Sequence, residues 1–121
     1  MTKRILVSYW YHKNTDIDKF IKDNFADAKP DIFADSGGYS AMTQGAQIDV
    51  LEYGKWVNKW GHLLTAYSNL DEIGNAIKTL ENQNILEQMG LSPLPVFHVG
   101  EDWQYLKYYV NKYQYIALGG M

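Results

Sequence analysis

The fold of this chain is decided by the segment 31-DIFADSGGYS-40, in which a short apolar run ends at a carboxylate and a pair of glycines. The run 32–34 suits a buried parallel strand, whereas the Asp35 carboxylate is too costly to bury without partners. Gly37 and Gly38 allow the backbone to approach another group closely. The segment therefore predicts a strand that brings an acid to a site, although Asp35 as a simple cap of the turn or of the next helix stays open.

Around this segment, apolar runs alternate with helical patterns, which is typical of βα units around a parallel sheet. We expect five strands, at residues 4–10, 31–35, 63–68, 94–98 and 115–118. Helices are expected between them, at about 17–25, 50–60, 73–89 and 102–113. Four βα units and a fifth strand follow from this order.

Cap residues and apolar spacing predict the ends and the buried faces of the helices. Asp49 with Glu52 resembles a capping box at the start of the second helix, and Gly90 suits the end of the third. The positions expected to be buried in the last two helices are Ile73, Ile77, Leu80 and Met89, then Leu106, Tyr109, Val110 and Tyr113.

Length and composition narrow the class of protein. With 121 residues and 46% hydrophobic content, the chain is expected to form one α/β domain, residues 1–121, with one core. The absence of cysteine excludes disulfides and thiolate zinc sites within it and favours an intracellular location. No apolar run suits a signal peptide or a membrane span. We expect a soluble, cytoplasmic protein.

Several kinds of site are disfavoured by what the sequence lacks. The formal net charge of -3, without clustered Lys or Arg, leaves no basic stripe for a nucleic-acid backbone. The three histidines have no pair at ligand spacing, so no metal is expected. The glycine pairs lack the lysine and spacing of a phosphate-binding loop. No cofactor is expected.

Polar residues follow every expected strand. They are Ser8 and Tyr9, then Asp35 and Ser36, then Asn69, Asp71 and Glu72, then His98 and Glu101, and finally Gly119 and Gly120. Parallel strands present their carboxyl ends at one edge, which is where a (βα) barrel builds its site. Asp35 and Asp71 are therefore candidate functional residues, while His98 suits either this site or a hydrogen-bonded place in the core.

At these positions the chain resembles the queuine/archaeosine tRNA-guanine transglycosylase superfamily. The resemblance lies in the segments 35-DSGGY-39, 71-DE-72 and 116-IALGG-120, and in their order and spacing. It covers nearly the whole chain and is greatest to the branch that inserts 7-deazaguanines into phage or bacterial DNA, relatives of the enzymes of tRNA queuosine modification.

The resemblance implies roles for individual residues. Asp35 would contact the purine-like base and help proton transfer, and Asp71 would read its Watson–Crick edge. His98 stands where the tRNA enzymes commonly carry Gln. The remaining residues implied in base binding are Ser36, Gly37, Gly38, Tyr39, Glu72, Gly119 and Gly120. A guanine-like ring suits such a set, because carboxylates accept from its N1–H and amino group while glycine exposes backbone amides to its carbonyl.

The same resemblance implies the N-terminal part of a (βα)8 TIM barrel, with an open flavodoxin-like sheet as the alternative fold. In the family, the aspartate nucleophile and the Cys/His zinc site lie on later parts of the chain, beyond the position of Met121. A second polypeptide or self-association is therefore expected to complete the barrel and cover its open edges.

Two functions follow as expectations. The first is the base-recognition half of a base-exchange enzyme, a pentosyltransferase acting on guanine or a 7-deazaguanine in DNA or tRNA. Its nucleophile would come from elsewhere. The second is a noncatalytic deazapurine-binding or regulatory module derived from that family.

Overall fold

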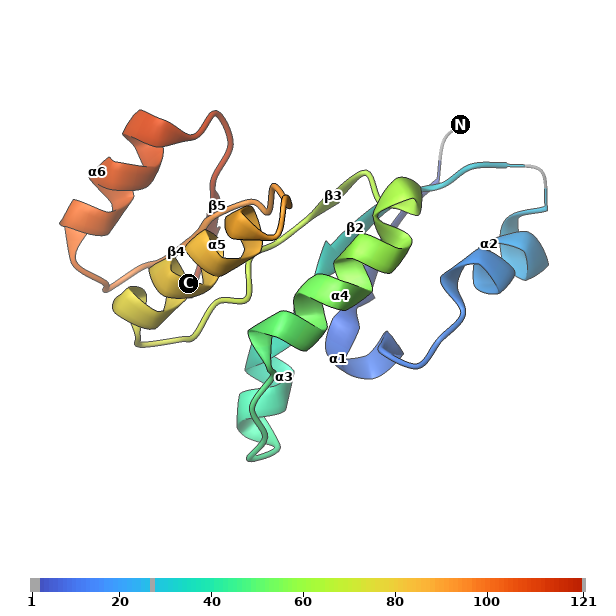
Figure 1. Ribbon diagram of the computed structural model, residues 1–121, viewed down its shortest axis with the longest axis horizontal. Coiled ribbons are helices and arrows are strands. Elements are labelled where there is room, and N and C mark those ends of the chain that lie inside the picture. The colour runs from blue at the N-terminus through green and yellow to red at the C-terminus, as the bar shows by residue number, and fades with distance from the viewer. Residues whose placement is uncertain (1–2, 27, 121) are drawn as a thin grey trace.

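The computed structural model describes residues 3–26 and 28–120, which form a mixed α/β structure around short parallel strands. Its strands are β1 (Arg4–Ser8), β2 (Asp31–Asp35), β3 (Ala66–Tyr67), β4 (Val96–His98) and β5 (Ala117–Gly119). Its helices are α1 (Tyr9–His12), α2 (Ile17–Phe25), α3 (Gly38–Thr43), α4 (Val50–Trp60), the 3-10 turn η1 (Gly61–Leu63), α5 (Ala76–Gln88) and α6 (Trp103–Lys112). Figure 1 shows their arrangement.

The strands pair in the order in which they occur in the chain. One parallel sheet has the order β1-β2-β3, a second pairs β4 with β5, and a parallel bridge from Ser68 to Leu94 connects them. In a flavodoxin-like sheet β1 would lie between β2 and β3. Here β2 holds the middle position, so the flavodoxin-like alternative does not describe this chain.

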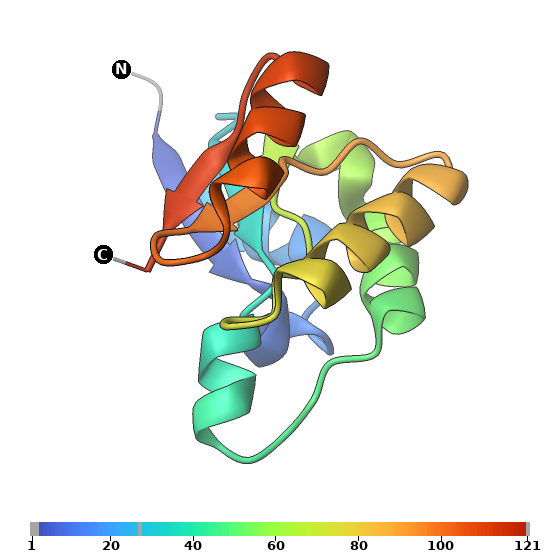
Figure 2. The same ribbon diagram turned by 90° about the vertical axis from the view of Figure 1, so that its left-hand side faces the viewer.

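The helices α4, α5 and α6 lie on one side of the strands, as Figure 2 shows in green, yellow-orange and red. Right-handed crossovers between consecutive parallel strands place their helices on the same face of a sheet. Each helix starts with a side-chain cap: Asp49 accepts from Leu51 N–H, Asn75 from Lys78 N–H and Asp102 from Gln104 N–H. The second-helix cap predicted at Asp49 is confirmed.

The main core lies between the β1-β2-β3 sheet and the helix α4. Ile32 and Ala34 of β2 are fully buried, and three aromatic rings pack beside them. The ring of Tyr9 lies edge-on to Tyr53 and Trp56, with centroids 5.2 and 5.3 Å away. This aromatic contact explains why the predicted first strand, 4–10, ends at Ser8: Ser8 is the last residue of β1 paired with β2, and Tyr9 turns into the core as α1 begins.

The other face of the strands is apolar and open. Leu6 of β1 is 68% exposed and Leu118 of β5 is 62% exposed. A hollow of about 530 Å³ lies on this face of β1 and β2, lined by residues that include Leu6, Phe33 and Ala66. Within the described residues, β1 and β5 each pair on one side only. β1 and β5, the first and last strands, lie at the left of Figure 2.

Three further predicted strands differ in extent. The strand predicted at 94–98 is β4 at 96–98, with Leu94 in an isolated bridge to Ser68. Residues 61–63 form the 3-10 turn η1, so the predicted strand 63–68 is reduced to β3 with flanking hydrogen bonds. The last strand lies at 117–119 rather than 115–118, because Ala117 is the residue that pairs with Val96.

The buried face predicted for α5 is wrong. The helix starts at Ala76 rather than at residue 73, and Ile73, Ile77 and Met89 are exposed. Its buried residues are Thr79, Asn82, Gln83 and Leu86. Polar groups are buried when they find hydrogen-bond partners, and these three polar side chains bind the loops around the helix. In α6, Val110 is likewise exposed, whereas Tyr109 is buried as predicted.

Candidate functional site

Asp35 ends β2 at the carboxyl edge of the sheet, and its side chain is held by two neighbours. Oδ2 accepts a hydrogen bond from the Gly37 N–H at 2.9 Å, and Oδ1 accepts from the Ser68 hydroxyl at 3.3 Å. The backbone carbonyl of Ser68 in turn accepts from the Tyr53 hydroxyl at 2.6 Å. Asp35 therefore does cap its turn, as the simpler interpretation proposed, and it is also tied to the loop after β3.

The two glycines after Asp35 are needed for close packing. A Cβ on Gly37, whose φ is +78°, would lie 2.5 Å from both Ser8 Oγ and Trp10 Cβ. A Cβ on Gly38 would lie 2.8 Å from the backbone oxygen of Asp71. The close approach expected of these glycines is thus an approach to the chain's own residues, and it sets the distance between this turn and the Asp71 loop.

Asp71 lies in the loop after β3, and its carboxylate meets the imidazole of His98. Asp71 Oδ2 is 2.7 Å from His98 Nε2, and the Asp71 side chain is 17% exposed. Burial raises the pKa of Asp71, the nearby charge of Asp35 raises it further, and His98 partly offsets both. The predicted pair of acids is therefore close enough for one carboxylate to act on the other.

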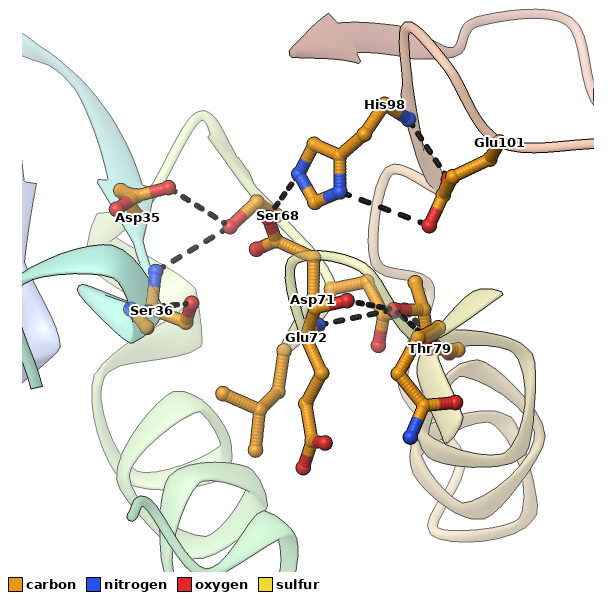
Figure 3. Close-up of polar contacts among 12 residues, drawn as sticks. Asp35, Ser36, Ser68, Asp71, Glu72, Thr79, His98 and Glu101 are labelled. Carbon is orange, nitrogen blue, oxygen red and sulfur yellow. Dashed lines mark hydrogen bonds and ion pairs between the residues drawn. The ribbon is translucent and has the colours of Figure 1, made fainter. Parts of the chain in front are cut away.

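His98 closes the site from β4, and Figure 3 shows its ring between Asp71 and Glu101. Glu101 Oε1 accepts from the backbone N–H of His98 at 2.9 Å. A Cβ on Gly119 would lie 2.7 Å from His98 Cδ2, so a glycine in β5 is what leaves room for the ring. His98 is buried and hydrogen-bonded, as a core histidine would be, yet its partner is the candidate site residue Asp71.

The loop that carries Asp71 is held by the polar face of α5. The Thr79 hydroxyl accepts from the Glu72 N–H at 2.9 Å. The side-chain amide of Asn82 donates to the Leu70 carbonyl at 3.0 Å, and that of Asn69 donates to the Thr79 carbonyl at 2.8 Å. The sequence contained a signal for this support, namely polar residues at 79, 82 and 83, spaced as one helical face.

Two hollows flank the 71–74 segment. The smaller, about 210 Å³, is lined by Gly38, Ala41, Met42, Ala46, Gln47, Ile48, Leu70, Asp71, Glu72 and Ile73. The other, about 610 Å³, opens beside α5 and α6, and its lining includes His98, Glu101 and Gly120. Asp71 therefore lines the smaller hollow and His98 the larger one, although their side chains are in contact.

The structure brings some of the predicted site residues together and leaves others apart. Asp71 contacts His98, Gly38 approaches the Asp71 backbone, and Gly119 leaves room for the His98 ring. Asp35 is tied through Ser68 to the loop that carries Asp71, and Glu72 lines the smaller hollow. Ser36 is fully buried, and its hydroxyl accepts a hydrogen bond from the Gly38 N–H within the turn after β2.

Tyr39 is 65% exposed on α3. Gly120 adopts a φ of +74°, and its neighbour Gly119 accepts from the Val99 N–H. Ser68, which donates to Asp35, is a contact that the sequence did not point to.

Residues 3–26 and 28–120 contain neither a metal-binding cluster nor a helix able to span a membrane. No three His, Asp or Glu side chains there are grouped so that they could hold a metal ion. None of the helices in that part of the chain is long and apolar enough to cross a bilayer.

Comparisons with known proteins add no relative. No family model, curated protein or solved structure matches this chain.

Proposed function

We propose that this chain is the base-recognition part of a base-exchange enzyme of the tRNA-guanine transglycosylase type. Its ligand is guanine or a 7-deazaguanine, as the free base or within DNA or tRNA. The observation that carries the proposal is the meeting of Asp35, Asp71 and His98 at one edge of parallel strands, with Asp71 buried and ionisable. Buried carboxyl groups with shifted pKa values are concentrated at functional sites.

The ligand's donors would be read by Asp71. A guanine ring presents an N1–H and an amino group side by side, and an ionised carboxylate can accept from both. The smaller hollow supplies apolar walls from Met42, Ile48 and Leu70 next to Asp71. A flat heterocycle between such walls, with few polar anchors, is the usual composition of a small-molecule site.

Asp35 has the second role. In the proposed reaction the base leaves or attacks the sugar carbon, and a carboxylate beside the ring moves a proton to or from a ring nitrogen. The charge of Asp35 already acts on Asp71 in the structure. The covalent glycosyl intermediate would form on an aspartate outside the described residues.

For the fold we propose the N-terminal part of a (βα)8 barrel. The consecutive parallel order of the strands, the helices on one side and the open apolar face on the other all agree with this architecture. The remaining strands of the barrel, with the nucleophile, would lie outside the described residues, for example on a second polypeptide. Another copy of the chain would cover the open face without supplying the nucleophile.

Binding of guanine and of 7-cyano-7-deazaguanine, measured by calorimetry, tests the proposal. The variant Asp71→Ala should weaken binding at least about tenfold, as expected for losing a charged hydrogen-bond partner. The control Asp23→Ala, on the exposed surface of α2, should bind as the wild type does. Hypoxanthine, which lacks the amino group, should bind more weakly than guanine because it leaves an acceptor unpaired.

Unchanged binding in Asp71→Ala would contradict the site. Exchange of labelled guanine into DNA or tRNA, tested with and without a second chain, then separates the two functions. Exchange only with the second chain supports the enzyme; binding without exchange under both conditions supports the noncatalytic binding module.

A further inference from the structure

The His98 ring has a carboxylate beside each of its nitrogens. Nε2 lies 2.7 Å from Asp71 Oδ2, and Nδ1 lies 3.8 Å from Glu101 Oε2. The side chains of His98 and Glu101 are 6% and 8% exposed. Within the described residues, neither His98 Nδ1 nor Glu101 Oε2 has a hydrogen-bond partner. Each of these two buried atoms lies 3.8 Å from the other, at ion-pair distance.

Glu101 is firmly placed for this contact. It lies in the turn after β4, and its other oxygen accepts the backbone N–H of His98 at 2.9 Å. One carboxylate therefore binds the backbone of His98 and lies at ion-pair distance from the ring of the same residue. Attraction between this carboxylate and a proton on Nδ1 would favour the ring orientation in which Nε2 meets Asp71.

The ionisable side chains nearest the His98 ring are carboxyl groups. Asp71 and Glu101 face it directly, Asp35 acts on Asp71 from β2, and Tyr109 of α6 faces Glu101. Neither Asp71 nor Glu101 has a Lys or Arg at ion-pair distance among the described residues. A neutral ring donating from Nε2 would point the Nδ1 lone pair at the Glu101 carboxylate, whereas an imidazolium donates from both nitrogens.

We propose that Glu101 is a positioning residue of the base site, which orients the His98 ring and favours a proton on Nδ1, so that Nε2–H is donated to Asp71 and Asp71 stays an ionised acceptor. The inference rests on the proposed function, because it assigns the purpose of the contact to base recognition. Glu101 itself lines the hollow on the opposite side of the loop from Asp71's hollow and acts only through His98.

The variant Glu101→Gln removes the charge of residue 101 while nearly keeping the size of its side chain. Gln keeps an oxygen to accept the His98 backbone N–H, and its amide N–H faces Nδ1, which favours the neutral ring. Glu101→Asp keeps the charge and withdraws it by one methylene. Glu81→Gln, an exposed change on α5, is the matched control.

The experiment measures the ring nitrogen chemical shifts of ¹⁵N-histidine-labelled protein between about pH 5 and 8, where histidine changes charge. In Glu101→Gln the His98 ring should become neutral at a lower pH than in the wild type, and guanine affinity near neutral pH should fall about tenfold. Glu101→Asp should restore the titration toward the wild type, and Glu81→Gln should change neither reading.

An unchanged His98 titration in Glu101→Gln overturns the inference, as does a changed titration with unchanged guanine affinity. If the wild type binds neither guanine nor 7-cyano-7-deazaguanine, the proposed function fails and with it the purpose assigned to Glu101. The ring shifts need no ligand, so they report the control of His98 by Glu101 separately from that failure. Melting temperatures of all variants show which of them are folded. If Glu101→Gln is unfolded, Glu101→Asp, whose charge lies farther from Nδ1, should shift the His98 ring signals in the same direction by less, and no shift at all overturns the inference.

Discussion

At the scale of single residues, Asp71 shows a conflict between stability and chemistry. Its carboxylate is largely buried and has one close polar side-chain partner, His98. Burying a charge is costly, so a protein without a use for it would gain by carrying an amide. The raised pKa of Asp71 expresses this cost.

The first prediction concerns the pH dependence of stability. Because burial raises the pKa of Asp71 above its value in the unfolded chain, protonation favours the folded state. That stabilisation is complete below the unfolded pKa of about 3.9 and is lost as the pH rises through the folded pKa. The wild type should therefore lose melting temperature over this window, and Asp71→Asn, which still accepts from His98, should lose less.

Calorimetric melting temperatures from about pH 4 to 7 check this prediction. At neutral pH the Asn variant should be at least as stable as the wild type, while binding guanine more weakly. Asp23→Asn on exposed α2 serves as the control and should follow the wild type. Parallel curves for Asp71→Asn and the wild type would mean that the buried carboxyl carries no stability cost.

At the scale of elements, α5 supports the site through hydrogen bonds. Its inward side chains Thr79, Asn82 and Gln83 bind backbone groups of the 69–72 loop and of Pro93. Two aliphatic side chains, Ile73 just before the helix and Ile77 within it, are exposed. The helix thus positions Asp71 by satisfying the backbone of an irregular loop, which cannot satisfy itself.

A pair of substitutions in α5 tests this assignment. Asn82→Ala removes the donor to the buried Leu70 carbonyl and should cost about 1–3 kcal/mol of unfolding free energy. Ile77→Ala, at an exposed position that the apolar pattern predicts as core, should change it by no more than about 0.5 kcal/mol. Urea denaturation of both variants measures the difference, and the reverse ranking would show that the apolar pattern was correct.

At the scale of the whole molecule, the strands are covered by helices on one side only. The uncovered face carries Leu6, Phe33 and Leu118. The outer edges of β1 and β5 have no strand partner in the described part of the chain. Open strand edges and large apolar faces are sites of association, which agrees with the proposal that further strands complete a barrel.

The double variant Leu6→Lys with Leu118→Lys tests that proposal. If the open face is an interface, the wild type should associate with itself or with a second chain, and the variant should be shifted toward the free monomer. Light scattering after size-exclusion chromatography measures this, with Leu51→Lys on the exposed side of α4 as the control. A wild type that stays monomeric alone and in its host extract would count against the interface, as would equal effects of the two kinds of variant.

The local sequence determined the elements and the candidate acids. Runs such as 32–34 and caps such as Asp49 act within a few residues, so β2, the start of α4 and the position of Asp35 at a strand end could be predicted from the sequence. The convergence of Asp35, Asp71 and His98 also followed, because parallel strands share one carboxyl edge.

Only the tertiary structure decided how these residues are held. The contact of His98 with Asp71 depends on the distance between two loops that are far apart in the chain. The polar core face of α5 depends on carbonyls of the 69–72 loop and of Pro93 that periodicity cannot show. A polar side chain is buried without a large cost only where it finds a hydrogen-bond partner. The position of that partner is set by the packed molecule rather than by the local sequence.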